Sequence, residues 1–214
     1  MKQTDRIPAT VPVEELLGLA IRHVNAGQRD RARVLCAHAV RIHPAHPAVL
    51  QLLALLDLQH GDAAPALRHA AESLAMRPDH LPTLRVLADA ARASGDPAQA
   101  SAALARIVAL APADADAWFE LALMRQDLNQ HDVAVEALQN VLRLAPWRAD
   151  AEVNLGIVLQ DSGRTDEAMR AYGRAYRLRE DSFGRIAHAL ATPNVGRLWL
   201  QLDDLRAALR DMPG

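Results

Sequence analysis

Apolar and small residues return along this chain every 34 residues, and no insertion interrupts the spacing. A leucine marks the first half of each unit, and an alanine followed by a large apolar residue marks the second half. The leucine stands at Leu19, Leu53, Leu87, Leu121 and Leu155, the alanine at Ala32, Ala66, Ala100, Ala134 and Ala168, and the large apolar residue at Ile42, Met76, Leu110, Leu144 and Leu178. A repeat of this period predicts stacked copies of one supersecondary unit.

Residues that end helices punctuate each unit twice. Glycine tolerates a positive φ at no steric cost and asparagine is the next best choice, so both suit the end of a first helix. They recur at Gly27, Gly61, Gly95, Asn129 and Gly163, and a proline, which cannot continue a helix, closes the unit at Pro44, Pro78, Pro112 and Pro146. The pattern predicts helix, turn, helix and break, five times. Glu180 stands where the fifth proline would be, so we expect that helix to run on slightly.

Small residues follow the repeated leucine and allow two helix backbones to approach each other. They are Ala20, Ala54, Ala88, Ala122 and Gly156. Polar residues after the turn suit the start of the second helix, where an anion interacts favourably with the helix dipole. We expect Asp30, Asp132, Thr165 and Asp166 to act as caps or first-turn anions.

Composition favours helices throughout and excludes several classes of protein. Half of the 214 residues are hydrophobic but only 3% are aromatic, so alanine and leucine, both good helix formers, must build the core. The net charge of −2 lacks the basic excess expected of a nucleic-acid binder. No apolar stretch is long enough to span a membrane, and Met1 to Pro12 lacks a secretory signal. Lys2 is the only lysine, which indicates a GC-rich bacterial gene, and we expect a cytoplasmic protein.

At these positions the chain resembles the tetratricopeptide repeat family. The match is best at Trp118, Leu121, Ala122, Ala134, Leu138 and Pro146, and again at Leu155, Gly156, Ala168, Tyr172 and Ala175. The resemblance implies an all-α fold, a right-handed α–α superhelix of five helix–turn–helix repeats. The repeats would span 13–46, 47–80, 81–114, 115–148 and 149–182, after an N-terminal extension at 1–12 and before a capping segment or degenerate sixth repeat at 183–214.

The chain departs from the family at one aromatic position of the first helix. His23, Asp57, Ala91, Arg125 and Leu159 stand where the family has tyrosine. This departure predicts looser packing in repeats 1 to 3.

In the family, the first helix of each repeat lines a concave groove that holds a partner. Carried over residue by residue, the resemblance implies a groove lined by Leu17, Ile21, Val24, Gln51, Leu55, Leu58, Arg85, Asp89, Arg92, Phe119, Leu123, Gln126, Val153, Asn154, Ile157 and Gln160. Its apolar positions predict that it binds an amphipathic helix or extended segment. Arg85 and Arg92 would hold an acidic group near the middle, or would pair with Asp57, Asp89 or Asp127 on neighbouring helices.

The residues that could carry chemistry do not form a recognisable site. His43, His46 and His80 fall in loops around prolines, without the cysteine or carboxylate set of a metal centre. Cys36 is the only cysteine, so no intramolecular disulfide can form. It occupies a core position of the repeat. The carboxylate pairs Asp114/Asp116 and Asp203/Asp204 lie at helix starts, where capping explains them. We therefore expect no catalytic residue, metal or cofactor.

The C-terminal 32 residues predict two further helices. Phe183, Ile186, Ala189 and Leu190 give an amphipathic helix that ends at Thr192–Asn194, and Asp203 or Asp204 opens a second with Leu205, Leu209 and Met212 on one face. Between them, Leu198, Trp199 and Leu200 have two readings. They pack on repeat 5 as part of a cap with Trp199 buried, or they form an extended segment that offers Trp199 to a partner or a second copy.

These observations predict a non-catalytic scaffold or adaptor that binds a protein or peptide partner. Two alternatives stay open. The chain could be a regulatory or substrate-recruiting subunit of a separately encoded transferase, or a scaffold that self-assembles into homo-oligomers through its C-terminal tail.

Overall fold

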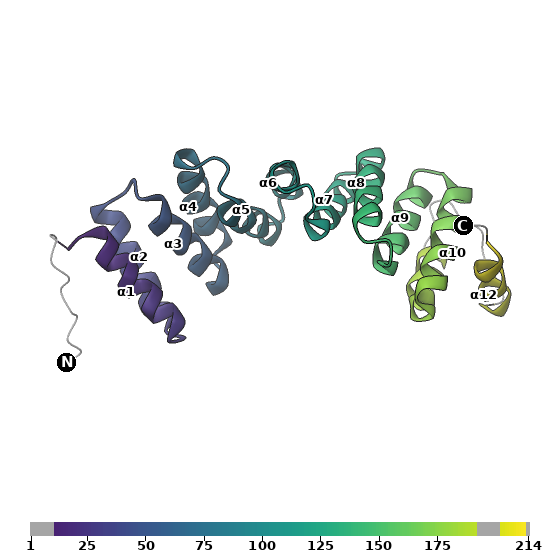
Figure 1. Ribbon diagram of the computed structural model, residues 1–214, viewed down its shortest axis with the longest axis horizontal. Coiled ribbons are helices and arrows are strands. Elements are labelled where there is room, and N and C mark those ends of the chain that lie inside the picture. Colours follow the sequence, from purple (N-terminus) through teal and green to yellow (C-terminus); the bar gives the residue numbers. More distant parts are fainter. Residues whose placement is uncertain (1–10, 192–201, 213–214) are drawn as a thin grey trace. The chain divides into compact units, whose positions relative to one another are not determined.

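The computed structural model describes residues 11–191 and 202–212, which form twelve α-helices and one short 3-10 helix (Figure 1). The described residues contain no strand, so the all-helical fold expected from the sequence is confirmed. The chain divides into two compact units, Met1–Leu110 and Ala111–Gly214. None of the described helices is long and apolar enough to span a membrane.

Unit 1 consists of three helix pairs. Its helices are α1 (Val13–Asn25), α2 (Arg29–Ile42), α3 (Pro47–His60), α4 (Ala63–Met76), α5 (Leu81–Ala93) and α6 (Pro97–Leu110). Each odd-numbered helix packs against the next one, α2 and α4 pack on the following pair, and α3 lies beside α5. The core is built from small side chains together with leucine and valine, such as Leu16, Ala20, Val49 and Leu84, all 1% exposed or less.

Unit 2 has two helix pairs and a C-terminal segment. Its helices are α7 (Ala115–Asp127), α8 (His131–Leu144), α9 (Ala149–Asp161), α10 (Thr165–Leu178), the 3-10 helix η1 (Glu180–Ser182), α11 (Phe183–Ala191) and α12 (Leu202–Asp211). α11 packs on α9, and α12 packs on α10, where it buries Leu205 and Leu209. One cluster of buried side chains runs through the unit and includes Tyr172, Ile186 and Leu190.

The turn residues expected from the sequence adopt the conformation that selects them. The four turn glycines have φ between +71° and +92°, and Asn129 is the one described non-glycine residue with a positive φ, at +56°. In these turns a backbone N–H reaches back five residues to a helix carbonyl, as Gln28 does to His23 and Gln130 to Arg125. The turns therefore satisfy carbonyl groups that each helix end leaves without a partner.

Helix ends differ from the sequence expectation at the end of α10 and follow one of its two alternatives at the starts of α2, α8 and α10. The predicted extension of α10 is wrong, because α10 ends at Leu178, the repeat position at which α8 and α6 end, and η1 follows. Asp30, Asp132 and Asp166 lie in first turns, but no side chain forms a capping hydrogen bond at the N-caps of α2, α8 or α10. Asp114 does cap α7, because its carboxylate accepts a 2.9 Å hydrogen bond from Ala117 N.

The two C-terminal helices are confirmed. Ile186 and Leu190 form the buried side of α11, and Leu205 and Leu209 form that of α12. Arg206 of α12 lies over the ring of Phe183, 4.3 Å from its centroid. Leu198, Trp199 and Leu200 lie outside the described residues.

Candidate functional site

Unit 1 presents apolar side chains along two of its first helices, α1 and α3. We define the first-helix face as the surface formed by Leu17, Ile21 and Val24 of α1, Gln51, Leu55 and Leu58 of α3, and Arg85, Asp89 and Arg92 of α5. Ile21 is 44% exposed. Leu17 and Val24 are half-buried and pack their inner sides on the core under α1, and Leu55 and Leu58 do the same above α3. Each side chain is anchored by the core while part of its apolar surface stays open to solvent.

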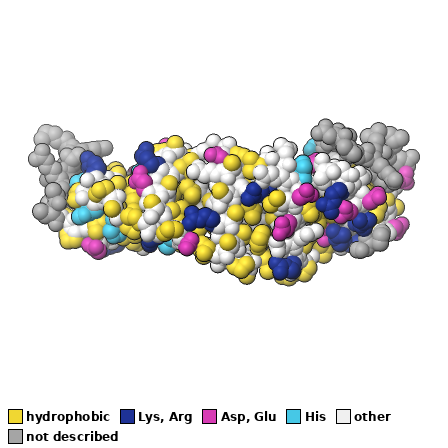
Figure 2. Space-filling model, turned by 90° about the horizontal axis from the view of Figure 1, so that it is seen from above, with side chains coloured by type: hydrophobic (Ala, Val, Ile, Leu, Met, Phe, Trp, Pro, Cys, Tyr) yellow, Lys and Arg dark blue, Asp and Glu magenta, His cyan; other side chains and the backbone are white. Residues whose placement is uncertain are grey.

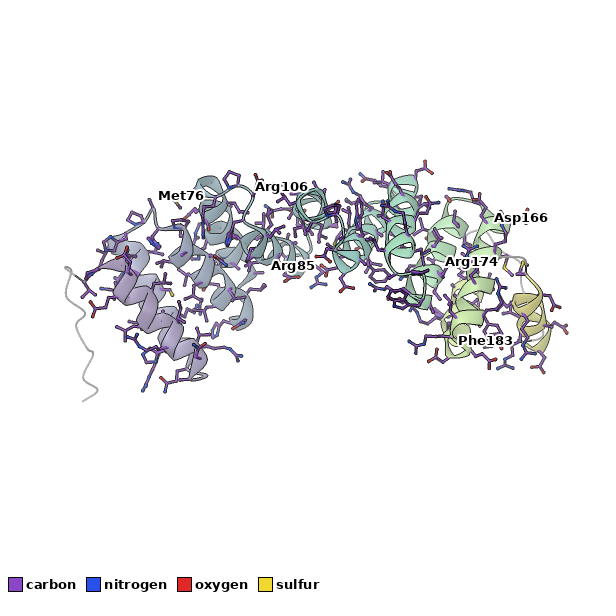
Figure 3. All side chains as sticks on the ribbon, viewed as in Figure 1. Met76, Arg85, Arg106, Asp166, Arg174 and Phe183 are labelled. Atoms are coloured by element: carbon purple, nitrogen blue, oxygen red, sulfur yellow. The ribbon has the colours of Figure 1, made fainter. Side chains whose placement is uncertain are left out.

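Polar groups of the first-helix face are engaged locally. Arg92 pairs with Asp89 of the same helix at 2.9 Å, and Gln51 accepts a 3.3 Å hydrogen bond from Arg77. Arg85 projects from α5 and is half-buried (Figure 3). Of the two roles expected for Arg92, pairing with an aspartate is therefore the one observed. Its partner, Asp89, lies on the same helix and not on a neighbouring one.

In unit 2, the face of α7 is partly covered by a cation. Phe119 lies 4.5 Å from the guanidinium carbon of Arg148, which stacks over its ring. Arg148 is held by Asp150 at 2.7 Å and Asp116 at 2.6 Å. The hydrogen bond from Arg148 keeps the pKa of Asp150 below its usual value, so this pair stays ionised at neutral pH. Leu123 and Gln126 are half-buried on the same helix.

The expectation that α9 lines an open groove is not met for three of its four residues. Val153 is fully buried, and Asn154 and Gln160 are 8% and 5% exposed. Gln160 donates a 3.0 Å hydrogen bond to the carbonyl of Ala189 in α11 and accepts another from the Tyr172 hydroxyl. α11 therefore covers this part of α9.

Only Ile157 of the four is half-buried, at the rim of the covered part of α9. It lines a surface pocket of about 420 Å³ with Gln160 and Asp161 of α9 and Gly184, Arg185 and His188 of α11. The sequence could not place this pocket, because α11 lies outside the five regular units and its packing partner was not fixed by the repeat.

A buried ion cluster in unit 1 was missed by sequence reasoning. Asp57 is 2% exposed, and its carboxylate is held by Arg33 Nε at 2.6 Å and His69 Nδ1 at 2.8 Å. Arg33 also pairs with Asp62. The sequence does carry one sign of this cluster. Asp57 stands at a core position where the family has an aromatic residue, and a buried carboxylate requires partners. In repeat 2, a specific polar cluster therefore occupies the position at which looser packing was expected.

Groups that could carry chemistry are dispersed or engaged. In the described part of the chain, no three His, Cys, Asp or Glu side chains come together as metal ligands would. His46 accepts from Val49 N at the start of α3, and His80 hydrogen-bonds Thr83 at the start of α5. Cys36 is 1% exposed, and burial raises the pKa of its thiol to about 12, which suppresses the reactive thiolate.

Two sequence models described as tetratricopeptide repeat match the chain, one over residues 81–124 and one over residues 125–185. None of the curated proteins matches its sequence. Among solved structures, YrrB, described as a tetratricopeptide repeat protein with an unusual peptide-binding site, superposes with a TM-score of 0.78 at 16% identity, covering 85% of this chain and 93% of that one.

Structures of MamA are also similar to this chain. One superposes with a TM-score of 0.71 at 20% identity, covering 79% of this chain and 93% of that one. MamA residues 41-end from Desulfovibrio magneticus RS-1 superpose with a TM-score of 0.68 at 21% identity, covering 79% and 96%. At these identities the likeness concerns the fold. The two matched repeat models, which together run from residue 81 to residue 185, show that the chain belongs to the tetratricopeptide repeat family.

Proposed function

We propose that this chain is a non-catalytic protein-interaction scaffold that binds an amphipathic helix or extended segment of a partner on the first-helix face of unit 1. The observation that carries the proposal is a set of large aliphatic side chains that are anchored in the core yet remain open. Ile21 is 44% exposed, and Leu17, Val24, Leu55 and Leu58 are half-buried around it and along α3.

Physical reasoning supports a protein ligand for this surface. Grouped apolar side chains that remain in contact with water favour a partner that removes them from it, at roughly 25 cal/mol per Å² of apolar area. Because Arg92 pairs with Asp89, it is not free to bind an anion. We therefore propose that apolar anchors supply most of the affinity and that polar groups set the register.

Unit 2 contributes less to the proposed binding. α11 covers most of the α9 positions, and Arg148 covers one side of Phe119. We assign a supporting role to Leu123 and Gln126 on α7, which are half-buried.

The test is a selection of random peptides displayed on phage against the purified chain, followed by affinity measurements on variants. We expect enriched peptides with apolar residues at helical or alternating spacing that lose affinity by about tenfold or more, or about 1.4 kcal/mol, in Ile21→Glu and Leu55→Gln. The matched control is Val133→Glu, because Val133 is 43% exposed on a second helix, α8.

Circular dichroism of each variant separates loss of binding from loss of folding. The proposal fails if enriched peptides bind Ile21→Glu and Leu55→Gln as tightly as the unchanged chain, with helix content intact.

A further inference from the structure

A cleft in unit 1 opens between the second helices α2 and α4. α2 and α4 form its walls, and Leu53 and Asp57 of α3 form its floor. The cleft has a volume of about 630 Å³. Its apolar lining includes Val34, Ala37 and Val40 from α2 and Pro65 from α4, and Val34 is 68% exposed. Figure 2 shows histidine side chains among apolar ones over the N-terminal helices.

The carboxylate at the floor of the cleft already has hydrogen-bond partners within unit 1. Asp57 receives hydrogen bonds from Arg33 at 2.6 Å and from His69 Nδ1 at 2.8 Å. These contacts raise the pKa of the Arg33 guanidinium, first through the hydrogen bond with Asp57, so Arg33 stays fully charged. Arg33 also pairs with Asp62, so both of its partners are carboxylates of this chain, and it is not available to a ligand.

Two other arginines of the cleft have no carboxylate partner in the described part of the chain. Arg68 NH2 lies 3.4 Å from His69 Nε2, and Arg41 NH2 lies 3.0 Å from His38 Nδ1. A guanidinium can only donate, so both imidazoles accept from their arginine. The two guanidinium groups keep further N–H groups and their positive charge for a ligand.

His38 adds a donor to the same wall. Since its Nδ1 accepts from Arg41, its proton lies on Nε2. That atom is buried and has no hydrogen-bond partner among the described residues. A buried donor without an acceptor is unfavourable, and an acceptor supplied by a ligand would relieve this.

The repeat framework does not require this set of residues. In unit 2 the positions 102 residues later keep two arginines, Arg143 and Arg170, and the floor leucine, Leu155, but replace the polar cluster and part of the apolar lining. Arg33, Asp57 and His69 correspond to Val135, Leu159 and Ala171, and the apolar Val34 and Pro65 correspond to Glu136 and Glu167. Helices α8, α9 and α10 therefore have Val, Leu and Ala at the positions of the polar cluster, and acidic residues where the α2–α4 cleft is apolar.

We propose that the α2–α4 cleft binds an acidic segment of a protein partner, with carboxylates on Arg41 and Arg68 and an adjacent apolar side chain against Val34. This site goes beyond the peptide binding assigned to the first-helix face and is independent of it. The guanidinium fork matches a carboxylate in two-point geometry, which favours Asp or Glu as the recognised residue. The apolar surface of Val34, Ala37 and Pro65 then selects acidic segments that also carry Leu, Ile or Val.

The same peptide selection provides the test when its enriched peptides are measured on a second set of variants. Peptides with Asp or Glu next to an aliphatic residue should be enriched on the unchanged chain. Arg41→Glu/Arg68→Glu and Val34→Asp should each weaken them by about tenfold or more. The matched control is Arg143→Glu/Arg170→Glu, which makes the same charge change at the same repeat positions in unit 2.

The result expected is loss of acidic peptides in the α2–α4 variants, with Ile21→Glu and Arg143→Glu/Arg170→Glu unaffected. Equal weakening by both arginine pairs would show general charge attraction and overturn the proposal. Acidic peptides that depend on Ile21 would overturn it as well, while supporting the first-helix face. Arg41→Gln/Arg68→Gln keeps the test informative if the double glutamate variant unfolds. A selection that enriches no acidic peptide, or cleft-dependent binding of single-stranded RNA without peptide binding, would also refute it.

Discussion

Tyr172 fills the space that the absence of a side chain at Gly156 leaves in the α9–α10 pair. A Cβ built on Gly156 would lie 2.3 Å from Cε1 of the Tyr172 ring, closer than two carbons can approach. The ring is fully buried and its hydroxyl donates a 3.0 Å hydrogen bond to Gln160. The other four pairs place alanine at the position of Gly156 and a smaller residue, Cys36, Ala70, Leu104 or Leu138, at that of Tyr172.

The effect of Gly156→Ala should therefore depend on residue 172. In the unchanged chain the added methyl overpacks the helix pair, which costs about 1–3 kcal/mol, against a gain of up to about 1 kcal/mol from helix propensity. We expect a net loss of about 1–2 kcal/mol in the free energy of unfolding, measured by urea titration.

When Gly156→Ala is combined with Tyr172→Leu, the pair copies Ala122 and Leu138 of unit 2. The effect of Gly156→Ala on the free energy of unfolding should then reverse its sign. In that background Gly156→Ala should be neutral or stabilising by up to about 1 kcal/mol. A double-mutant cycle with no coupling between the two positions would contradict the steric relationship.

Removing Asp57 alone should destabilise unit 1, whereas replacing the whole cluster should not. Asp57→Ala leaves Arg33 and His69 without their buried acceptor, and we expect a loss of about 2–4 kcal/mol, reduced because Arg33 is 30% exposed and keeps Asp62. The triple variant Arg33→Val, Asp57→Leu, His69→Ala copies Val135, Leu159 and Ala171, and it should recover most of the loss. The urea midpoints of the two variants test this prediction. A triple variant no more stable than Asp57→Ala would show that the cluster stabilises the fold by itself.

The buried thiol of Cys36 gives a pH dependence of defined sign. Burial is the larger cause of its raised pKa of about 12, and the charge of Asp57 adds to it. An unfolded chain has a cysteine pKa near 8.5, so only the unfolded state loses the proton between about pH 8.5 and 12. The contribution to stability is complete below about pH 8.5 and is lost as the pH rises towards 12.

Two measurements check this behaviour. A disulfide reagent such as dithionitrobenzoate should react with the native chain at pH 8 far more slowly than with the urea-unfolded chain. Cys36→Ala should also flatten the alkaline decrease in unfolding free energy. Rapid native labelling would contradict the burial of the thiol.

The regular part of the fold could be predicted from the sequence because local signals and packing signals coincide there. Gly27 and Asn129 each mark a turn that requires a positive φ, and Ala20 or Ala122 marks a helix crossing that requires a small side chain. These requirements recur every 34 residues, so each copy supports the others.

The candidate sites could be predicted less well because they depend on departures from the repeat. Asp57 was expected to loosen its helix pair, but it forms an ion pair with Arg33, which lies 24 residues away in the sequence. Periodicity carries no information about such a partner. Gln160 was expected to face a groove, but the short helix that follows the last repeat supplies its acceptor, Ala189. The repeat predicts on which face of a helix a side chain lies. Neighbours outside the repeat decide whether that side chain stays exposed to solvent.

The cover that α11 forms over α9 leads to a last prediction. Ile186 is fully buried and Leu190 is 4% exposed, so α11 is held chiefly by these two side chains and by the Gln160 hydrogen bond. Ile186→Ala should remove about 2–4 kcal/mol of that packing and increase amide hydrogen exchange in α11 and in the covered part of α9, while exchange in α1 to α6 stays unchanged. The matched control is Ile21→Ala, because Ile21 is 44% exposed and loses little packing. If Ile186→Ala leaves exchange in α9 unaltered, α11 does not protect this surface, and Val153, Asn154 and Gln160 return to the set of residues that a partner can reach.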